Sequence, residues 1–296
     1  MGAAHRAARW PGRCLSCLSG RERRRAVRVS IITVAYKAAA TIGDTCAAVA
    51  AQDWPDIEHI IIDGASGDGT TDIVAATARP GHIFICEPDD GLYFAMNKGL
   101  ALATGDLIGF LNADDFFCRR DAVRLLVAAA QAAPDADAVS AAAVNVREHD
   151  PWQRTRSYPP TPYAPWMLRF AHMPSHLGFY ARRAAVARVG HFDPAIGIGA
   201  DFDWMVRFFA VEGLRAQPVP QTIVNMRDGG LTNRGFDSRR RINTEALATL
   251  RHHGLLALTP LVWAKYVVKA LQFVVPARDW PPPPDLRCGP DLPVRE

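Results

Sequence analysis

The chain has 296 residues, of which 49% are hydrophobic and 22% are charged, a composition typical of a globular protein large enough for one α/β domain. Its net charge of +4 comes from residues 1–28, where eight arginines face a single acid, so the rest of the chain carries −3. That balance argues against a nucleic-acid-binding surface on the body of the protein, and six cysteines in so long a chain exclude a disulfide framework.

The first segment, residues 1–26, is predicted to be a disordered basic tail. It lacks the apolar core of a signal peptide. We expect it to be solvated, with contact to acidic lipid or nucleic acid as the alternative. Cys14 and Cys17 form a C-x-x-C pair, but no second pair follows at zinc spacing, so no metal or redox role is expected there. The other cysteines are expected to be buried in a reducing compartment.

From residue 27 onward, short apolar runs alternate with alanine-rich helical stretches, which predicts one domain over residues 27–250. Continuous apolar strands separated by helices favour a mainly parallel sheet with helices on both faces, which is an α/β fold. Asp68 or Thr70 can cap the second helix. The strands are expected at 27–36, 57–64, 82–88 and 106–113, and the helices at 38–52, 69–78 and 91–103.

Polar side chains follow each of these strands, at the point where the strand ends. Carboxyl ends of parallel strands meet at one edge of a sheet, where ligands bind. Acidic groups that converge there repel one another unless a cation or hydrogen-bond donors satisfy them, and a hard divalent metal with a diphosphate is the simplest solution. The four strand ends carry Thr33, Ala35 and Tyr36; then Asp63; then Glu87, Asp89 and Asp90; then Asn112, Asp114 and Asp115.

Beyond residue 120 the pattern changes: a helix is expected at 121–133, a strand at 136–146 and an irregular proline-rich loop at 151–166. Helix is expected from about 238. No run of 18 uncharged apolar residues occurs, so no certain transmembrane helix is predicted.

A C-terminal amphipathic helix is predicted within residues 251–278, with Thr259 as N-cap and Pro276 as stop. Lys265, Lys269 and Gln272 form one narrow polar stripe on it. The helix either packs on the domain or lies in a membrane surface. Residues 279–296 are predicted to be a disordered proline-rich tail.

Two stretches carry a resemblance to a known family. Residues 30–74, "SIITVAYKAAATIGDTCAAVAAQDWPDIEHIIIDGASGDGTTDIV", contain a Q-x-x-x-x-x-E step and a strand that ends in D-x-x-S-x-D-G-T. Residues 87–115, "EPDDGLYFAMNKGLALATGDLIGFLNADD", follow in order. Together they resemble family 2 glycosyltransferases of the GT-A fold, in a subgroup similar to colanic-acid-type polysaccharide transferases. The resemblance runs roughly from 29 to 232.

This resemblance implies a nucleotide-sugar site. Asp114 would bind Mn²⁺ or Mg²⁺, which bridges the diphosphate of the donor, and Ala113 lies beside it. Asn112 takes the place of a first aspartate and brings no charge, so Asp115 is expected to compensate. Asp63 would accept a hydrogen bond from uracil or ribose. The remaining donor-site residues would be Thr33, Ala35 and Tyr36 around the base, and Asn97 and Lys98 facing the phosphates.

The resemblance also implies where the chemistry occurs. Asp201, in "GADFDW", would be the catalytic base that takes the acceptor's hydroxyl proton, with Asp203 as the second choice. His176 would lie on the acceptor side, although a structural histidine fits equally well. The stretch "RDGGLT" would close over the donor. Asp90 and Phe94 stand where the subgroup carries a basic residue and an aspartate, which leaves the donor sugar open.

We therefore expect an inverting, metal-dependent glycosyltransferase that moves a sugar from a UDP-linked donor to a hydroxyl of a glycan or lipid-linked acceptor. It would act in the cytoplasm or at the inner face of the plasma membrane, and not on nucleic acid. An inactive scaffold is the main alternative, because of Asn112. A sugar nucleotidyltransferase would need a Gly- and Arg/Lys-rich signature after the first strand, and a dehydrogenase would need G-x-G-x-x-G; "VAYKAAATIG" has neither.

Overall fold

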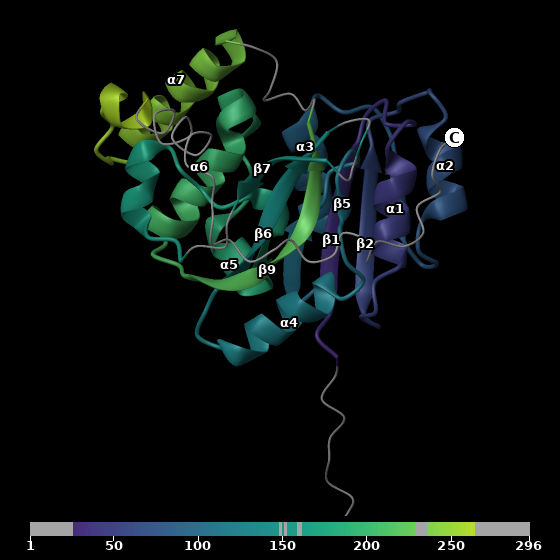
Figure 1. Cartoon of the computed structure of the whole chain (residues 1–296). Helices are drawn as coiled ribbons and strands as arrows, with labels where there is room; N and C mark the ends of the chain where they lie inside the picture. The colour runs from purple at the N-terminus through teal and green to yellow at the C-terminus, as the bar shows by residue number, and fades with distance from the viewer. Residues whose placement is uncertain (1–25, 148–149, 151–152, 159–161, 229–235, 264–296) are drawn as a thin grey trace, which may run out of the picture.

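A computed structural model describes residues 26–147, 150, 153–158, 162–228 and 236–263 (Figure 1). The predicted tails and most of the predicted C-terminal helix lie outside these residues. So does most of "RDGGLT", whose proposed closure over the donor stays a prediction. Residues 259–263 are helical, so Thr259, which was predicted as the N-cap, already lies within the helix.

The centre of the fold is one sheet, which has nine strands in the described part of the chain. The four strands predicted from the sequence are confirmed and run parallel, in the order β3-β2-β1-β4. Their bounds are Val29–Ala35 for β1, Ile57–Asp63 for β2, Ile83–Cys86 for β3 and Leu107–Phe110 for β4. Every residue of β1 is buried, as expected of a strand covered on both faces.

The α/β fold is confirmed. The second half of the sheet contains both parallel and antiparallel pairs, so the sheet as a whole is less parallel than the sequence predicted. β8 (Phe179–Arg182) pairs antiparallel with β4 and β6. β6 (Ala138–Val146) pairs parallel with β9 (Ala216–Arg227). β5 (Phe116–Phe117) pairs antiparallel with β9. The prediction of an irregular loop over 151–166 is partly wrong, because β7 (Arg154–Tyr158) extends the sheet beside β6.

Helices cover both faces of the sheet, as predicted. One apolar core joins α3, α5, α6 and α7 to one face; two others join α1, α2 and α4 to the opposite face. The α-helices are α1 (Ile42–Ala50), α2 (Thr70–Thr77), α3 (Leu92–Leu102), α4 (Ala122–Ala132), α5 (Arg183–Val189), α6 (Ala200–Val206) and α7 (Phe236–His252), with short turns η2 (Pro165–Phe170), η3 (His176–Gly178), η4 (Pro194–Gly199) and η5 (Arg207–Val211).

Local contacts explain several of these elements. Gly99 lets α3 lie against Ile32 of β1, since a Cβ at residue 99 would overlap that side chain. The N-cap of α2 is Gly69, and not Asp68 or Thr70 as the sequence predicted; Asp68, one residue earlier, accepts from the backbone N–H and the hydroxyl of Thr70. Of the cysteines described, Cys46 and Cys118 are buried, as expected, but Cys86 is exposed.

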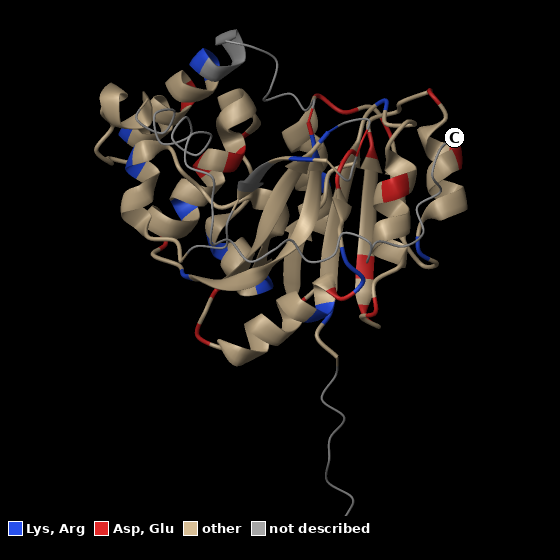
Figure 2. Cartoon of the chain, viewed as in Figure 1, with Lys and Arg blue, Asp and Glu red and all other residues tan. Residues whose placement is uncertain are grey.

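Acidic residues gather at the end of the sheet where the parallel strands finish, at the top of the view in Figure 2. Their placement agrees with the prediction that the polar strand ends share one edge. Over the residues that the structure covers, no helix combines the length and apolar character needed to cross a bilayer.

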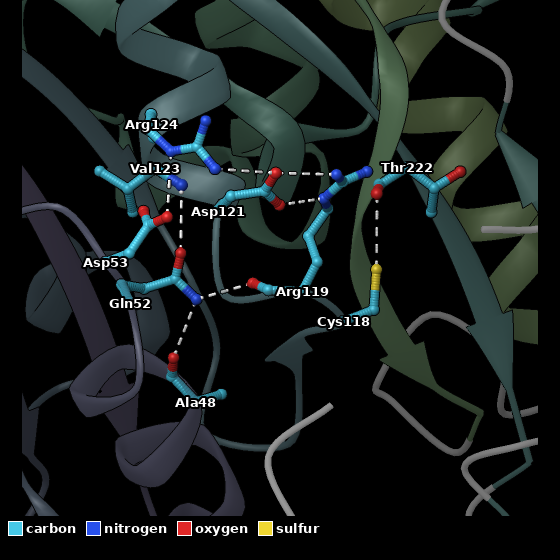
Figure 3. Close-up of polar contacts among 9 residues, drawn as sticks. All are labelled: Ala48, Gln52, Asp53, Cys118, Arg119, Asp121, Val123, Arg124 and Thr222. Carbon is cyan, nitrogen blue, oxygen red and sulfur yellow. Dashed lines mark hydrogen bonds and ion pairs between the residues drawn. The ribbon is translucent and has the colours of Figure 1, made fainter. Parts of the chain in front are cut away.

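The Q-x-x-x-x-x-E step serves the scaffold. The side-chain amide of Gln52 donates to the Arg119 carbonyl at 2.8 Å and accepts from the N–H of Val123 at 3.1 Å, which joins the end of α1 to the start of α4 (Figure 3). Glu58 accepts from the hydroxyls of Ser30 and Thr104. These bonds fix the loops opposite the acidic edge.

Candidate active site

Three of the predicted site residues converge at the acidic edge from distant parts of the chain. Asp114 lies in the turn between β4 and β5, His176 begins η3, and Asp201 lies in the first turn of α6. The Nδ1 atom of His176 is 3.8 Å from Oδ2 of Asp201. The charge of His176 acts on the pKa of both carboxyl groups. The sequence predicted a role for each of these residues independently, and the structure brings the three side chains together.

Burial sets the acidity of the two carboxyl groups. Desolvation raises the pKa of Asp201, and the nearby His176 opposes that shift. Desolvation likewise raises the pKa of Asp114, against the positive charges of Arg227 and His176. A carboxylate with a raised pKa is a stronger base than one in water and gains more from a neighbouring cation. Both properties suit a site that handles a proton and a metal-bound phosphate.

Asp115 has a different place from its neighbour. Its side chain is buried, and its Oδ1 accepts from the backbone N–H of Arg227 at 3.0 Å. Its pKa is raised well above the usual range by burial and by the charge of Asp114. We therefore assign Asp115 to the attachment of the turn to β9. The prediction that it replaces the missing charge of Asn112 gains no support from this geometry.

Arg227 is the residue that sequence reasoning missed. Its guanidinium donates to the Asp114 carbonyl at 3.0 Å and to the Asp44 carboxylate, and it lies over the Phe116 ring at 4.9 Å. It therefore supplies fixed positive charge beside Asp114. The signal was the "RD" that opens "RDGGLT", which was read only as a closing loop.

The ends of β1 and β2 carry three of the residues that were predicted to surround the base. Asp63 is fully buried and accepts from the backbone N–H of Ser66 at 2.9 Å as well as from its hydroxyl. Tyr36 is 66% exposed at the end of β1, and its ring rests on Gly64. Ala35 is buried beside it. The exposed ring of Tyr36, which packs on Gly64, is available for stacking. The carboxylate of Asp63 stabilises the loop that follows β2 by accepting the two hydrogen bonds from Ser66.

Thr33 lies deeper than the prediction required. Its side chain is fully buried, and its hydroxyl is 3.0 Å from Nε2 of His59 on β2. Burial lowers the pKa of His59 to about 3, so this ring is neutral. Thr33 therefore bonds within the sheet and supports the ends of β1 and β2 from below.

Two residues of α3 were predicted to face the phosphates. Asn97 uses its amide on the backbone of Phe192, donating to the carbonyl and accepting from the N–H, each at 2.9 Å. That pattern ties α3 to the loop before α6. Lys98 is paired with Glu87 at 2.6 Å and Asp89 at 2.5 Å, and these hydrogen bonds raise its pKa. Lys98 neutralises the acids after β3.

Asp203 lies two residues beyond Asp201 and therefore on the other side of the helix. Its carboxylate is buried and pairs with Arg207 at 2.8 Å and with Nε2 of His253 at 2.8 Å. Both oxygens are thus occupied, one by a residue of η5 and the other by the residue that follows α7. These contacts favour Asp201 as the base and give Asp203 a packing role.

The surroundings of Asp114 fit a hard divalent ion that shares its ligands with a phosphate. Oδ1 of Asn112 is buried and accepts no hydrogen bond in the described residues. Within the same residues, no three His, Cys, Asp or Glu side chains could hold a metal by themselves. Mg²⁺ commonly binds through one or two carboxylates together with substrate phosphates and water. Asp114 and the Asn112 oxygen would be the protein's own ligands to such an ion, with phosphate and water supplying the rest.

Comparison with known proteins follows this geometry. Residues 30–211 match the description "Glycosyl transferase family 2". An uncharacterized glycosyltransferase of Mycobacterium tuberculosis is 33% identical over 193 residues, which cover 60% of this chain and 68% of that protein. A PGL/p-HBAD biosynthesis glycosyltransferase of Mycobacterium bovis is 25% identical over 248 residues, covering 82% and 93%.

Two solved structures share the fold. Staphylococcus aureus TarS 1–349 in complex with UDP-GlcNAc has a TM-score of 0.57 at 14% identity, with 74% of this chain and 66% of that chain covered, slightly under two thirds of its length. The mannosyltransferase PcManGT of Pyrobaculum calidifontis, in complex with GDP-Man and Mn²⁺, has a TM-score of 0.54 at 21% identity, covering 87% and 84%. At these identities the likeness shows the fold alone.

Proposed function

Because the chain belongs to glycosyltransferase family 2, we propose that it transfers a sugar from a nucleotide sugar to a hydroxyl group of a glycan or lipid-linked acceptor, with inversion at the anomeric carbon. The observation that carries this proposal is the convergence of Asp114 and Asp201 around His176. One carboxylate suits the metal diphosphate, and the other suits the attacking hydroxyl. Asp114 and Asp201 would thus carry out the two roles from different elements, the turn after β4 and helix α6, at one edge of the sheet.

The donor would lie across the ends of β1, β2 and β4. Tyr36 would stack on the base, and the corner around Asp63 would read an N–H or hydroxyl donor of the nucleoside. We propose a uridine diphosphate donor. The structural neighbour bound to UDP-GlcNAc supports it, while the neighbour bound to GDP-Man keeps a purine donor as the alternative.

The diphosphate would lie beside Asp114. A Mn²⁺ or Mg²⁺ ion held there, with Asn112 as a neutral partner, would stabilise the negative charge that develops on the leaving phosphate. The neighbour in complex with Mn²⁺ supports this part of the proposal. The fixed positive charge of Arg227, which donates to the Asp114 carbonyl at 3.0 Å, acts in the same direction.

Asp201 would act as the base. The acceptor oxygen bonds to the anomeric carbon, the bond between that carbon and the phosphate oxygen breaks, and the hydroxyl proton passes to Oδ of Asp201. Burial raises the pKa of Asp201, which strengthens it as a proton acceptor. His176, half-buried at 3.8 Å, would orient this carboxylate on the acceptor side.

We propose a role in polysaccharide or glycolipid biosynthesis, with the acceptor carried at the inner face of the plasma membrane. The relative named for PGL/p-HBAD biosynthesis supports a lipid-linked product. Leu256, Leu258 and Trp263, close to the end of the described residues, are exposed and apolar, which is consistent with peripheral membrane contact. The narrower resemblance to colanic-acid-type transferases remains a prediction from residues 87–115.

An inactive scaffold is the second candidate, and Asn112 is the observation that favours it, because a carboxylate is missing at the metal position. Titration calorimetry separates the two. The transferase predicts that UDP or GDP binds and that Mn²⁺ tightens the binding. If no nucleoside diphosphate binds with or without metal, the donor proposal fails and the scaffold becomes the better account.

A further inference from the structure

One peptide unit, which joins Ile198 to Gly199 just before α6, is held at both of its polar ends. Its carbonyl accepts from the Tyr93 hydroxyl of α3 at 2.8 Å. Its N–H donates to Oε2 of Glu245 on α7 at 2.8 Å. A peptide unit is planar, so two bonds from opposite partners fix its orientation. Asp201 follows two residues later, within the first turn of α6.

Both hydrogen-bond partners of this peptide, Tyr93 and Glu245, are themselves held in place. Burial raises the pKa of the Tyr93 hydroxyl, so it stays a donor at any working pH. Glu245 has a side chain only 15% exposed and pairs with Arg241 one helical turn earlier, at 2.7 Å. The ion pair with Arg241 and the hydrogen bond to Gly199 together restrain this carboxylate. The two hydrogen bonds that orient the 198–199 peptide are therefore already formed in the folded chain.

The glycines of η4 make the close approach of α7 possible. A Cβ on Gly197, whose φ is +82°, would lie 2.9 Å from Nη2 of Arg241 and 3.1 Å from Oε1 of Glu245. A Cβ on Gly199 would lie 3.2 Å from Oε2 of Glu245. Real Cβ contacts are rarely so short, so the Arg241–Glu245 pair lies directly on the loop that leads into α6.

A second contact secures the other side of α6. His253, which follows α7, bonds Asp203 at 2.8 Å. Helix α7 therefore contacts the entry of α6 through Glu245, and the residue that follows α7, His253, contacts the far side of α6. This whole helix lies beyond residues 30–211, the range that matches the family description. The matched range therefore contains Tyr93 and Asp201 but neither Glu245 nor His253.

We propose that Glu245 is a positioning residue for Asp201: it fixes the 198–199 peptide and so sets where the base meets the acceptor hydroxyl. The proposal rests on the proposed transferase function. It makes α7 part of the machinery for the chemical step and leaves donor binding to the strand ends around Tyr36, Asp63 and Asp114. A base displaced by about 1 Å costs on the order of 100-fold in rate, so the effect should appear in kcat.

The test compares Glu245→Ala and Glu245→Gln in the full chain. Turnover is followed as nucleotide release from UDP-GlcNAc, UDP-glucose or GDP-mannose with Mn²⁺, with water as the hydroxyl that takes the sugar. Amide hydrogen exchange is followed at Gly199. Glu245→Ala should lower kcat by about 100-fold, leave the Kd for the nucleoside diphosphate within about twofold, and speed exchange at Gly199 by at least about tenfold. Glu245→Gln keeps an acceptor oxygen and should recover most of the lost kcat.

The matched control is Glu212→Ala, since Glu212 is also paired with an arginine, Arg188 at 3.1 Å, but lies after η5 and away from the 198–199 peptide. It should leave kcat and Gly199 exchange unchanged. Circular dichroism at the assay temperature confirms that each variant is folded. The proposal is overturned if Glu245→Ala leaves either kcat or Gly199 exchange at the wild-type value, or if Glu245→Gln is as slow as Glu245→Ala. If the wild type releases no nucleotide from any donor, the proposed function is refuted. The exchange rate at Gly199 still tests whether Glu245 holds the 198–199 peptide.

Discussion

Replacing Asp114 by asparagine gives a sharp prediction, because the result should depend on whether a metal is present. The substitution keeps size and hydrogen bonding but removes the charge beside the diphosphate. With Mn²⁺ present, the bound ion loses one anionic ligand in a half-buried site. In the metal-free state, the diphosphate loses a like-charged neighbour. The two effects have opposite signs.

The magnitude follows from the position of Asp114. Unit charges about 4 Å apart at a protein surface interact by about 4 kcal/mol. Desolvation offsets part of this, so a net loss of about 3 kcal/mol is expected with metal, or roughly 100-fold in Kd. Without metal, relief of repulsion should leave the Kd for UDP unchanged or tighten it by up to about fivefold.

Titration calorimetry with UDP measures both conditions, once with Mn²⁺ and once with a chelator. Asp135→Asn is the control, since Asp135 is exposed at the opposite edge of the sheet, before β6. It should change neither Kd. Equal weakening of Asp114→Asn with and without Mn²⁺ would refute the reasoning, because it would mean that Asp114 contacts the nucleotide itself and does not act through a cation.

Three further predictions concern recognition and stability. Tyr36→Ala should weaken UDP binding by about 10-fold while Tyr36→Phe leaves it unchanged, because stacking on a base contributes roughly 1–3 kcal/mol; fluorescence or calorimetric titration reads this. Gln52→Ala should lower the free energy of urea unfolding by about 2 kcal/mol, since the Val123 N–H and the Arg119 carbonyl lose their buried partner; unchanged stability would contradict the scaffold role. His59 has a folded pKa of about 3, below its unfolded value of about 6.5. The stabilisation that neutral His59 gives to the folded state is therefore complete above about pH 6.5. As the pH falls from about 6.5 toward 3, the free energy of unfolding decreases by about 1.4 kcal/mol per pH unit. Urea titrations of His59→Gln should lack that slope, which the exposed-site control His252→Gln should retain.

The first half of the fold could be predicted because its signals are local. Runs such as "IEHIIIDG" are apolar throughout, and a strand covered on both faces shows that pattern from the sequence alone. The carboxyl ends of parallel strands then share an edge by topology, which placed Asp63 and Asp114 together. The second half depends on pairings across the chain. β9 reaches β6 from about 80 residues away, and β7 has no apolar run of its own, so neither is visible in a local pattern.

The site shows the same division. A family motif located Asp114 and Asp201, but it could not show how each side chain is used. Asn97 bonds backbone and Asp203 bonds Arg207 and His253, and both uses depend on partners distant in sequence. Arg227 was missed for the same reason, because its importance comes from the contact of its guanidinium with the turn after β4.

The most direct test of the central claim is single-turnover release of nucleotide from a sugar nucleotide by the wild type and by Asp201→Asn, with the donor Kd measured in parallel. The account predicts an equal Kd, within about twofold, and a rate at least about 100-fold lower in the variant, since a positioned base contributes roughly 10²–10⁴. A variant that turns over at the wild-type rate, with the same donor affinity, would contradict the assignment of Asp201 as the base.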